Sequence, residues 1–363
     1  MTSGALTIGI DARAATEVTA GRGRVVRELL RALAARSDDH RYLCYARTPW
    51  EEPLDERFRW MLIGAGDPLW HVQAADSAAR RCDAFLSTNS YLTVILCRTP
   101  TVAIVYDLVA FDRGTSPNRR SAVIERLTLG GAVRRAAGLL CISQATADAL
   151  TARYPAAAGR VTVAPLAVAP VFAAPPADEL QDLPPAGFVL AVGTLEPRKN
   201  LPRLVKAYAA LPDELQRAHP LVVVGAQGWR TGPTLAALRS LGSRCIPLGG
   251  VSDGALAELY RRCAVFCYPS LSEGFGLPVL EAMAAGAAVV TSDVSSLPEV
   301  GGDAVEYVDP LSVASIADGL ARVLTSPERR RRLAALGPRR AGEFSWDRFA
   351  QLTLSALARA VAG

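Results

Sequence analysis

With 363 residues the chain is too long for one ordinary domain and long enough for two, each with its own hydrophobic core. Half of its residues are apolar and 21% are charged, which is typical of a globular protein and excludes a disordered chain. The net charge of +5 is compatible with small anionic ligands but too small for committed nucleic-acid binding.

The first part of the chain alternates apolar runs with helical patterns, in the rhythm of parallel βαβ units. LTIGID at 6–11 predicts the first strand, and the pattern of 24–36 predicts the helix after it. The runs at 101–107 and 138–143 predict further strands, and the helical pattern QATADALTARY follows the second of them. This order predicts a doubly wound parallel sheet, whose ligands bind at the carboxyl ends of its strands.

A proline-rich segment at 165–187 interrupts the rhythm and predicts a linker between two domains. Beyond it the rhythm restarts, with strands expected at FVLAVGT, PLVVVG, CIPLGG, AVFCYPS and AAVVTSD. We therefore expect an N-terminal domain over 1–168 and a C-terminal domain over 169–345. The predicted fold class is α/β, with two Rossmann-like, doubly wound parallel-sheet domains facing across a cleft.

The stretch SLSEGFGLPVLEAMAAG, at 270–286, places two carboxylates around a turn that contains glycine and proline. Pro278 suits the first position of a helix, which we expect to continue through VLEAMAA and to end at Gly286. Glu273 then lies in the loop and Glu281 in the first helical turn, so they face different parts of a ligand. The helix start suits a diphosphate and the carboxylates suit neutral hydroxyls. Alternatively, Glu281 complements the helix dipole and the glycines only form a turn.

A second candidate segment, VGTLEPRKN at 192–200, follows the first strand of the second half. Gly193 relieves crowding at the strand end, and Arg198 with Lys199 places two cations beside a helix that starts at Asn200. A departing diphosphate needs such cations, because its negative charge must be stabilised. A solvated basic turn is the alternative.

Two weaker candidates lie in the first half. ATEVTAGRGRVVRELL places Gly21 and Gly23 before a helix, a spacing that also fits an ordinary turn. AIVYDLVAF places Tyr106 and Asp107 at a strand end. Tyrosine donates a hydrogen bond but is a poor base near neutral pH, and a tyrosine that only packs in the core is the alternative.

E-G-F-G-L-P-V-L-E, followed by A-M-A-A-G-A-A-V-V-T-S-D and S-L-P-E-V, resembles the E-x7-E region of the retaining glycosyltransferases of family 4. The resemblance implies the GT-B architecture, in which the second domain binds a nucleotide sugar and a terminal helix, at about 346–363 in this chain, packs back on the first. It implies that Glu273 holds hydroxyls of the transferred sugar, Glu281 holds the ribose, and a basic pair holds the diphosphate. Many members have arginine directly after the glycine, where this chain has Thr194, and often histidine where it has Tyr106.

The resemblance assigns three groups of residues. Catalytic contributions fall on Arg198, Lys199 and Glu273. Donor binding falls on Gly193, Thr194, Arg198, Lys199, Gly225, Val251, Leu256, Glu273, Gly274, Phe275, Gly276, Leu277 and Glu281, although core packing explains Val251 and Leu256 equally well. The loop that borders the acceptor and the diphosphate comprises Gly21, Gly23, Tyr106 and Asp107.

The predicted function is transfer of a hexose, with retained configuration, from a nucleotide-diphosphate sugar to a hydroxyl of a polysaccharide, lipid-linked or natural-product acceptor. The alternatives are a catalytically weak nucleotide-sugar-binding protein and a GT-B sugar-nucleotide epimerase. We expect no cofactor and no metal, because three histidines and seven scattered cysteines show no metal-ligand spacing.

The expected location is the cytoplasm, since no apolar run reaches the length of a membrane span and the N-terminus lacks the pattern of a signal peptide. The basic, partly amphipathic segment 116–138 predicts peripheral contact with an anionic membrane, and an ordinary solvated helix is the equal alternative. Nucleic acid is not expected as a partner.

Overall fold

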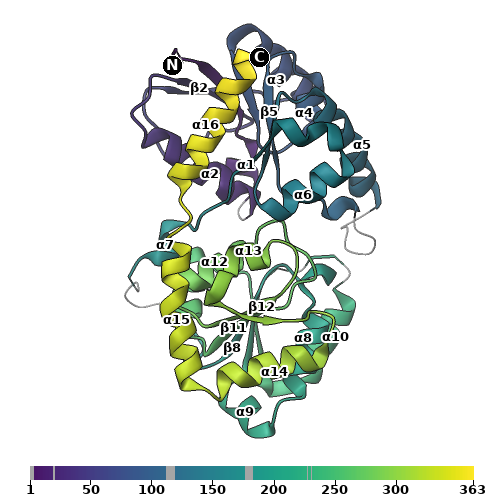
Figure 1. The fold of residues 1–363 in the computed structure, drawn as a ribbon, viewed down its shortest axis with the longest axis vertical. Helices are drawn as coiled ribbons and strands as arrows, with labels where there is room; N and C mark the ends of the chain where they lie inside the picture. The colour runs from purple at the N-terminus through teal and green to yellow at the C-terminus, as the bar shows by residue number, and fades with distance from the viewer. Residues whose placement is uncertain (1–3, 19–20, 112–118, 176–182, 227, 230) are drawn as a thin grey trace. The chain divides into compact units, whose positions relative to one another are not determined.

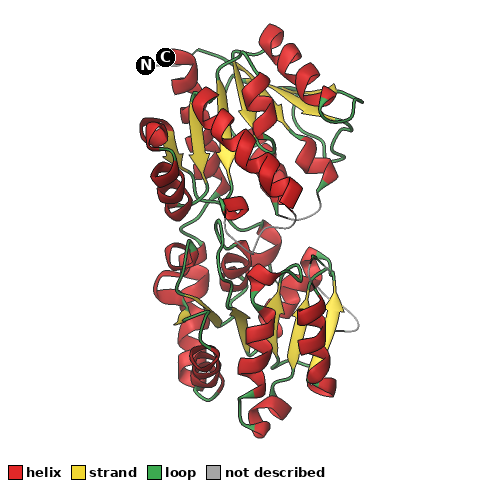
Figure 2. Cartoon of the chain, turned by 90° about the vertical axis from the view of Figure 1, so that its right-hand side faces the viewer, coloured by secondary structure: helices red, strands yellow, loops and turns green. Residues whose placement is uncertain are grey.

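The computed structural model describes residues 4–18, 21–111, 119–175, 183–226, 228–229 and 231–363. The chain divides into two compact units. The first contains the described residues of 1–111, 118–166 and 345–363, and the second contains those of 167–344. Each unit is built on one parallel sheet with helices on both of its faces (Figure 2).

The sheet of the first unit confirms the strands predicted near residues 6, 101 and 138. All its pairings are parallel. From β1 the chain adds strands toward one edge of the sheet, and from β4 it adds them toward the other edge. A topological switch point therefore lies between β1 and β4. In order across the sheet the strands are β3 (Phe58–Leu62), β2 (Arg41–Ala46), β1 (Thr7–Asp11), β4 (Ala84–Ser87), β5 (Thr101–Val105), β6 (Gly138–Cys141) and β7 (Val161–Val163).

The central strands β4, β5 and β6 are buried along their whole length, as expected for parallel strands covered on both faces. The C-terminal helix belongs to this unit, where it packs against α2 and beside β4, β5 and β6 (Figure 1). The helices of the unit are α1 (Arg13–Glu17), α2 (Arg22–Ala34), α3 (Leu69–Arg81), α4 (Tyr91–Leu96), α5 (Arg119–Arg135), α6 (Gln144–Arg153) and α16 (Trp346–Ala362).

The second unit repeats the same plan with a six-stranded parallel sheet. Its switch point lies between β8 and β11. Across the sheet the strands are β10 (Cys245–Gly249), β9 (Leu221–Val224), β8 (Val189–Val192), β11 (Val265–Tyr268), β12 (Val289–Ser292) and β13 (Glu306–Val308). The helices are α7 (Pro170–Ala173), α8 (Leu201–Ala209), α9 (Asp213–Ala218), α10 (Gly232–Ser240), α11 (Asp253–Arg262), α12 (Leu277–Ala284), α13 (Leu297–Gly301), α14 (Val313–Leu324) and α15 (Pro327–Ala341).

The segment expected to be a linker, 165–187, is in part a packed element of the second unit. It contains α7, which packs against α11 and α12. Phe172 of α7 is fully buried, and its ring lies edge-on to Tyr260 with the centroids 6.0 Å apart. Prolines therefore did not mark an unpacked segment, because Pro170 occupies the first turn of a helix, where its missing N–H costs nothing. Residues 176–182 of this segment lie outside the described residues.

Candidate functional site

Six side chains meet at the carboxyl ends of β8 and β11, which is the switch point of the second sheet. A 3₁₀ turn, Pro197–Lys199, carries two of the cations predicted from sequence, and the loop after β11 carries Glu273. We name this group the strand-end cluster. Its members are Glu196, Arg198, Lys199, Tyr268, Ser270 and Glu273.

Glu273 lies at the centre of the strand-end cluster, and its side chain is 8% exposed. Its Oε1 accepts hydrogen bonds from Lys199 Nζ at 2.8 Å, Tyr268 Oη at 2.7 Å and Ser270 Oγ at 2.6 Å. Its Oε2 accepts from Arg198 Nη1. Arg198 also donates to Glu196 Oε1 at 2.7 Å. Two cations and two carboxylates thus balance each other in this cluster.

The charges of the strand-end cluster shift one another's pKa values. Burial by itself would raise the pKa of Glu273, but the positive charges of Lys199 and Arg198 outweigh it and lower that pKa to about 2. Burial lowers the pKa of Lys199 below its usual value, and the nearby Glu273 carboxylate only partly offsets this. The carboxylate is therefore ionised at neutral pH and is a poor base.

Two glycines predicted from sequence allow close contacts at the strand ends beside the strand-end cluster. A Cβ on Gly193, whose φ is +140°, would lie 3.2 Å from Lys199 Cε, so the glycine leaves space for the lysine stem. A Cβ on Gly225, whose φ is +154°, would lie 2.0 Å from the carbonyl oxygen of Gly193. Both residues follow strands and have backbone angles that favour glycine. The end of β9 therefore approaches the end of β8 because Gly225 lacks a side chain, whereas Gly193 leaves room for Lys199.

The glycine-containing loop after β11 is fixed by serines from the segment after β12. Ser295 Oγ accepts a hydrogen bond from the Glu273 backbone N–H at 2.9 Å. Ser296 Oγ donates to the carbonyl oxygens of Glu273 and Phe275, at 3.0 and 2.7 Å. Gly274, Phe275 and Gly276 are buried, and Leu277 is half-buried at the start of α12. The carboxylate of Glu273 is thus held from its backbone as well as from its side chain.

The position of Glu281 differs from the predicted one. Helix α12 begins at Leu277, so Pro278 is its second residue and Glu281 its fifth, which lies in the second turn. The helix starts one residue early because Gly276 adopts a left-handed conformation (φ +108°) and acts as its N-cap. Glu281 is 3% exposed, and its Oε2 accepts a hydrogen bond from Tyr260 Oη at 3.4 Å.

The remaining donor-binding candidates of this unit differ in exposure. Thr194 follows β8 and is exposed, and Val251 is half-buried between β10 and α11. Leu256 is buried within α11. Burial favours the packing alternative for Leu256, whereas exposure leaves the other two accessible to a ligand.

The predicted glycine loop of the first unit forms the start of α2. Gly21 is the N-cap, with φ at +55°, and Gly23 lies inside the first helical turn. A Cβ on Gly23 would lie 1.7 Å from the carbonyl oxygen of Val18. Gly23 is therefore required because α2 starts against the chain that precedes it.

Tyr106 and Asp107 follow β5 in the first unit. Tyr106 is 8% exposed, the Arg22 guanidinium lies 5.2 Å from its ring centroid, and within the described residues its hydroxyl has no hydrogen-bond partner. Asp107 Oδ1 accepts from the backbone N–H of Val109 at 3.0 Å, as in a turn. The tyrosine borders a pocket of about 240 Å³, lined by Arg22, Asn89, Ser90, Tyr91, Ile104, Tyr106, Ile124, Glu125 and Thr128.

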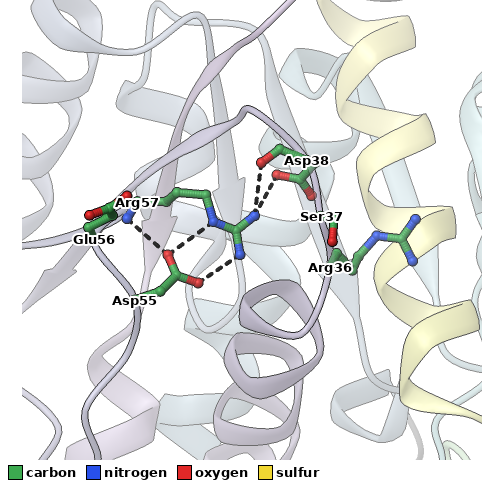
Figure 3. A pocket seen from close by; sticks show the side chains of 6 residues that line it. All are labelled: Arg36, Ser37, Asp38, Asp55, Glu56 and Arg57. Atoms are coloured by element: carbon green, nitrogen blue, oxygen red, sulfur yellow. Dashed lines mark hydrogen bonds and ion pairs between the residues drawn. The ribbon is translucent and has the colours of Figure 1, made fainter.

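A second pocket of the first unit, of about 340 Å³, contains only residues that precede β2 and β3 (Figure 3). Arg57 donates to Asp38 at 2.9 Å and to Asp55 at 2.7 Å. Arg36, which also lines it, pairs with Asp347 of α16. These charges satisfy one another at the amino ends of the strands, opposite to the edge where ligands of such sheets bind. We interpret this pocket as a structural feature.

Sequence reasoning missed several members of the site. Tyr268 and Ser270 stand two positions apart at the end of β11, so their side chains project to the same side of the sheet. Both hydroxyls there donate to Glu273. Polar residues with that spacing at the end of a buried strand were the available signal. Glu196 and Tyr260 had no comparable signal, because their contacts depend on segments that are distant in the sequence or on a turn.

Two family models match the chain. The model described as Glycosyltransferase Family 4 matches residues 19–172, and the model described as Glycosyl transferases group 1 matches residues 182–340. Two doubly wound parallel sheets with a charged cluster at a switch point define a protein of GT-B architecture. The chain belongs to family 4 of the glycosyltransferases, as the resemblance predicted.

O-antigen chain mannosyltransferase B of Escherichia coli is 42% identical over 173 residues, which are 47% of this chain and 45% of that protein. The match therefore spans less than half of that relative's length. Sucrose-phosphate synthase from Thermosynechococcus elongatus has a TM-score of 0.75 at 20% identity, over 96% of this chain and 97% of that one.

Anabaena Alr3699/HepE, whose structure is a complex with UDP and glucose, has a TM-score of 0.72 at 16% identity, over 97% of this chain and 99% of that one. At these identities the structural likeness shows the fold, and it confirms the predicted GT-B architecture. Among the helices of the described residues, none combines the length and apolarity needed to cross a membrane.

Proposed function

We propose that the protein is a retaining glycosyltransferase that moves a hexose from a nucleotide-diphosphate sugar to an acceptor hydroxyl without a metal ion. The observation that carries this proposal is the strand-end cluster, in which two cations share one ionised carboxylate at the switch point of the second sheet. A diphosphate needs cations, and a sugar needs a hydrogen-bond acceptor for its hydroxyls. The strand-end cluster provides cations and a hydrogen-bond acceptor in direct contact with each other.

The proposed step breaks the bond between C1 of the sugar and the diphosphate oxygen. A bond from C1 to the acceptor oxygen forms on the same face of the sugar, and the acceptor proton passes to the departing phosphate oxygen. The products are a glycoside and a nucleoside diphosphate. Arg198 and Lys199 stabilise the negative charge that develops on the leaving group, which is the electrostatic contribution of a preorganised site.

Glu273 acts in this proposal as a hydrogen-bond acceptor for sugar hydroxyls. Its pKa of about 2, set by the two neighbouring cations against the effect of burial, makes it unsuitable as a general base near neutral pH. Three side chains donate to Oε1 and, within the described residues, Arg198 donates to Oε2, so the acceptor capacity left for a sugar hydroxyl lies on Oε2. Glu281 is proposed to hold the ribose hydroxyls of the donor.

Mannose is the first sugar to test, because the E. coli relative is a mannosyltransferase by name. UDP is among the first nucleotides to test, because the HepE structure contains it. For the acceptor we propose the hydroxyl of a glycan, which the pocket beside Tyr106 would contact in the first unit. Peripheral contact with an anionic membrane belongs to the same proposal, since α5 exposes the apolar side chains of Val123, Ile124 and Leu127 beside basic residues.

The test is a panel of UDP-, GDP-, dTDP-, CDP- and ADP-sugars, measured by thermal shift and by release of nucleoside diphosphate in the presence of EDTA. Stabilisation by one nucleotide, turnover in EDTA, and a product with the donor's anomeric configuration by NMR would support the proposal. An inverted product would rule out retention, and loss of turnover in EDTA would rule out a metal-free step. Binding without turnover across glycan acceptors would favour the binding-protein alternative.

A further inference from the structure

Tyr268 is the last residue of β11 and is 2% exposed. Its hydroxyl lies between the two ionised groups of the strand-end cluster: Lys199 Nζ donates to it, and it lies 2.7 Å from Glu273 Oε1. The ammonium also lies 4.9 Å from the centroid of the tyrosine ring. That distance follows from the contact with the hydroxyl, so the tyrosine contacts the lysine through its oxygen.

The chemistry of the three groups fixes the direction of these hydrogen bonds. A lysine ammonium only donates, an ionised carboxylate only accepts, and a tyrosine hydroxyl does one of each. The proton of Tyr268 therefore points to Glu273, and its oxygen lone pair receives a proton of Lys199. One buried hydroxyl thus relays between a cation and an anion, and such chains strengthen one another in a low-dielectric site.

Lysine at this position stands out in the composition. The 363-residue sequence has 40 basic residues, and only Lys199 and Lys206 among them are lysines. Lys206 lies exposed on α8. A lysine shifts its pKa readily when buried, whereas an arginine stays charged. The buried Lys199 can therefore lose its charge, which an arginine at this position would keep. Its protonated state needs support from neighbouring groups.

We propose that Tyr268 is a positioning residue, which keeps Lys199 protonated and aimed and which holds Glu273 in place when a diphosphate engages the cations. This inference rests on the proposed transferase function. A bound diphosphate must compete with Glu273 for the two cations. Lys199 and Arg198 cannot give their full charge to the diphosphate while both pair with Glu273. Hydrogen bonds from Tyr268 and Ser270 then remain on the carboxylate.

The groups that face Lys199 come from several elements. Glu273 and Tyr268 contact it directly, while Arg198 and Glu196 act on it through their charges. Burial already lowers the pKa of Lys199. Tyr268→Phe removes one acceptor for the charged ammonium and keeps the charges of the other three groups, so it should lower the pKa of Lys199 further.

The first experiment measures that pKa without any need for activity. Protein labelled with carbon-13 lysine contains two labelled side chains, Lys199 and Lys206, and a pH titration by NMR separates the buried lysine from the exposed one. In Tyr268→Phe we expect the Lys199 pKa to move down by about one unit, the effect of losing a hydrogen bond to a charged group. The Lys206 signal should not move, and circular dichroism shows whether the variant is folded.

The matched control is Tyr208→Phe. Tyr208 is another fully buried tyrosine of the second unit, but its hydroxyl donates to the backbone oxygens of Gln216 and His219 at 3.0 and 2.9 Å. Tyr208→Phe removes a buried tyrosine hydroxyl and its hydrogen bonds without touching the strand-end cluster, so the Lys199 pKa should stay at its original value. An unchanged Lys199 pKa in folded Tyr268→Phe, or an equal shift in the control, overturns the inference.

The second experiment uses turnover. Tyr268→Phe should reduce kcat by roughly tenfold, with a smaller change in the donor KM, and should move the basic limb of the kcat–pH profile to lower pH. A purely structural role would lower kcat equally at all pH values, and that result would overturn the inference. If the unchanged protein turns over no nucleotide sugar, the proposed function fails, and the NMR titration still decides the role of Tyr268.

Discussion

The two units follow the same plan but treat a buried tyrosine at a strand end in opposite ways. Tyr268, at the end of β11 in the second unit, lies between Lys199 and Glu273 and uses its hydroxyl as both donor and acceptor. Tyr106, just after β5 in the first unit, is also buried, but within the described residues its hydroxyl has no partner. One site is internally satisfied, and the other retains a polar group that borders a pocket.

This difference separates a preorganised site in the second unit from a polar group of the first unit that still lacks a partner. The strand-end cluster of the second unit is preorganised, because its charges fix one another before a ligand arrives. The hydroxyl of Tyr106 gains its hydrogen bond only if a ligand supplies one, since a buried unpaired polar group costs free energy. We therefore expect substitutions in the strand-end cluster to change kcat and its pH dependence strongly. Substitution of Tyr106 should change the acceptor KM only mildly.

Lys199→Ala should have the largest effect. Removal of a preorganised cation from the leaving group should lower kcat by roughly two to three orders of magnitude. Lys206→Ala, which removes the exposed lysine of α8, is the control and should leave kcat unchanged. Steady-state release of nucleoside diphosphate measures both variants. An unaltered kcat in Lys199→Ala would contradict the proposal that this lysine stabilises the leaving group.

Glu273→Gln should change the response of stability to acid. The Glu273 pKa is lowered from 4.5 to about 2 in the folded protein, because the two cations outweigh burial. The resulting stability is fully present above about pH 4.5 and is lost as the pH falls toward 2; it amounts to about 3 kcal/mol of unfolding free energy. The variant should therefore lose less stability than the original protein over this range.

Urea unfolding at pH 6 and at pH 3 measures this difference. The control is Glu258→Gln, a half-buried carboxylate that pairs with Arg261 on α11 at 3.5 Å. Parallel acid dependence in Glu273→Gln and the original protein would show that the strand-end cluster is not the ion-pair centre that the structure describes.

Much of the fold followed from the sequence, because parallel strands buried on both faces appear as continuous apolar runs. The strands near Ile8, Val102 and Leu190 are of this kind, with buried apolar runs at 8–10, 102–105 and 189–191. Strand β3 is not, since it is half-exposed along most of its length and carries Arg59 within it. An edge strand of that composition has no periodic signal that separates it from a loop.

The sequence predicted three members of the strand-end cluster, Arg198, Lys199 and Glu273, but neither its other three members nor its contacts. The E-x7-E stretch and the basic pair are visible as short patterns, whereas Arg198 and Glu273 stand 75 residues apart and meet only because β8 and β11 are neighbours. Nor did the sequence indicate that the two cations bind the carboxylate. The second-turn position of Glu281 was missed because it depends on the backbone angle of Gly276, which a pattern of residue types does not specify.

Glu281→Gln should have an intermediate effect and should act on binding. Loss of one charged acceptor for ribose hydroxyls should weaken donor affinity by about tenfold or more, with little change in kcat. Isothermal titration with the nucleoside diphosphate identified by the panel measures it directly. The variant keeps a side chain of the same size beside Tyr260, which limits any change in packing. Normal affinity would contradict the ribose assignment and leave Glu281 as a structural acid.

Tyr106→Phe should have the smallest effect, and its sign makes the sharpest contrast with Tyr268→Phe. Because the Tyr106 hydroxyl is buried without a partner within the described residues, its removal should leave stability unchanged or raise it by up to about 1 kcal/mol. Tyr268→Phe breaks two existing hydrogen bonds and should lower stability. If the Tyr106 hydroxyl binds the acceptor, the variant should raise the acceptor KM a few-fold and leave the donor KM alone. Destabilisation by Tyr106→Phe would mean that the hydroxyl is satisfied in the free protein, and the contrast between the units would then disappear.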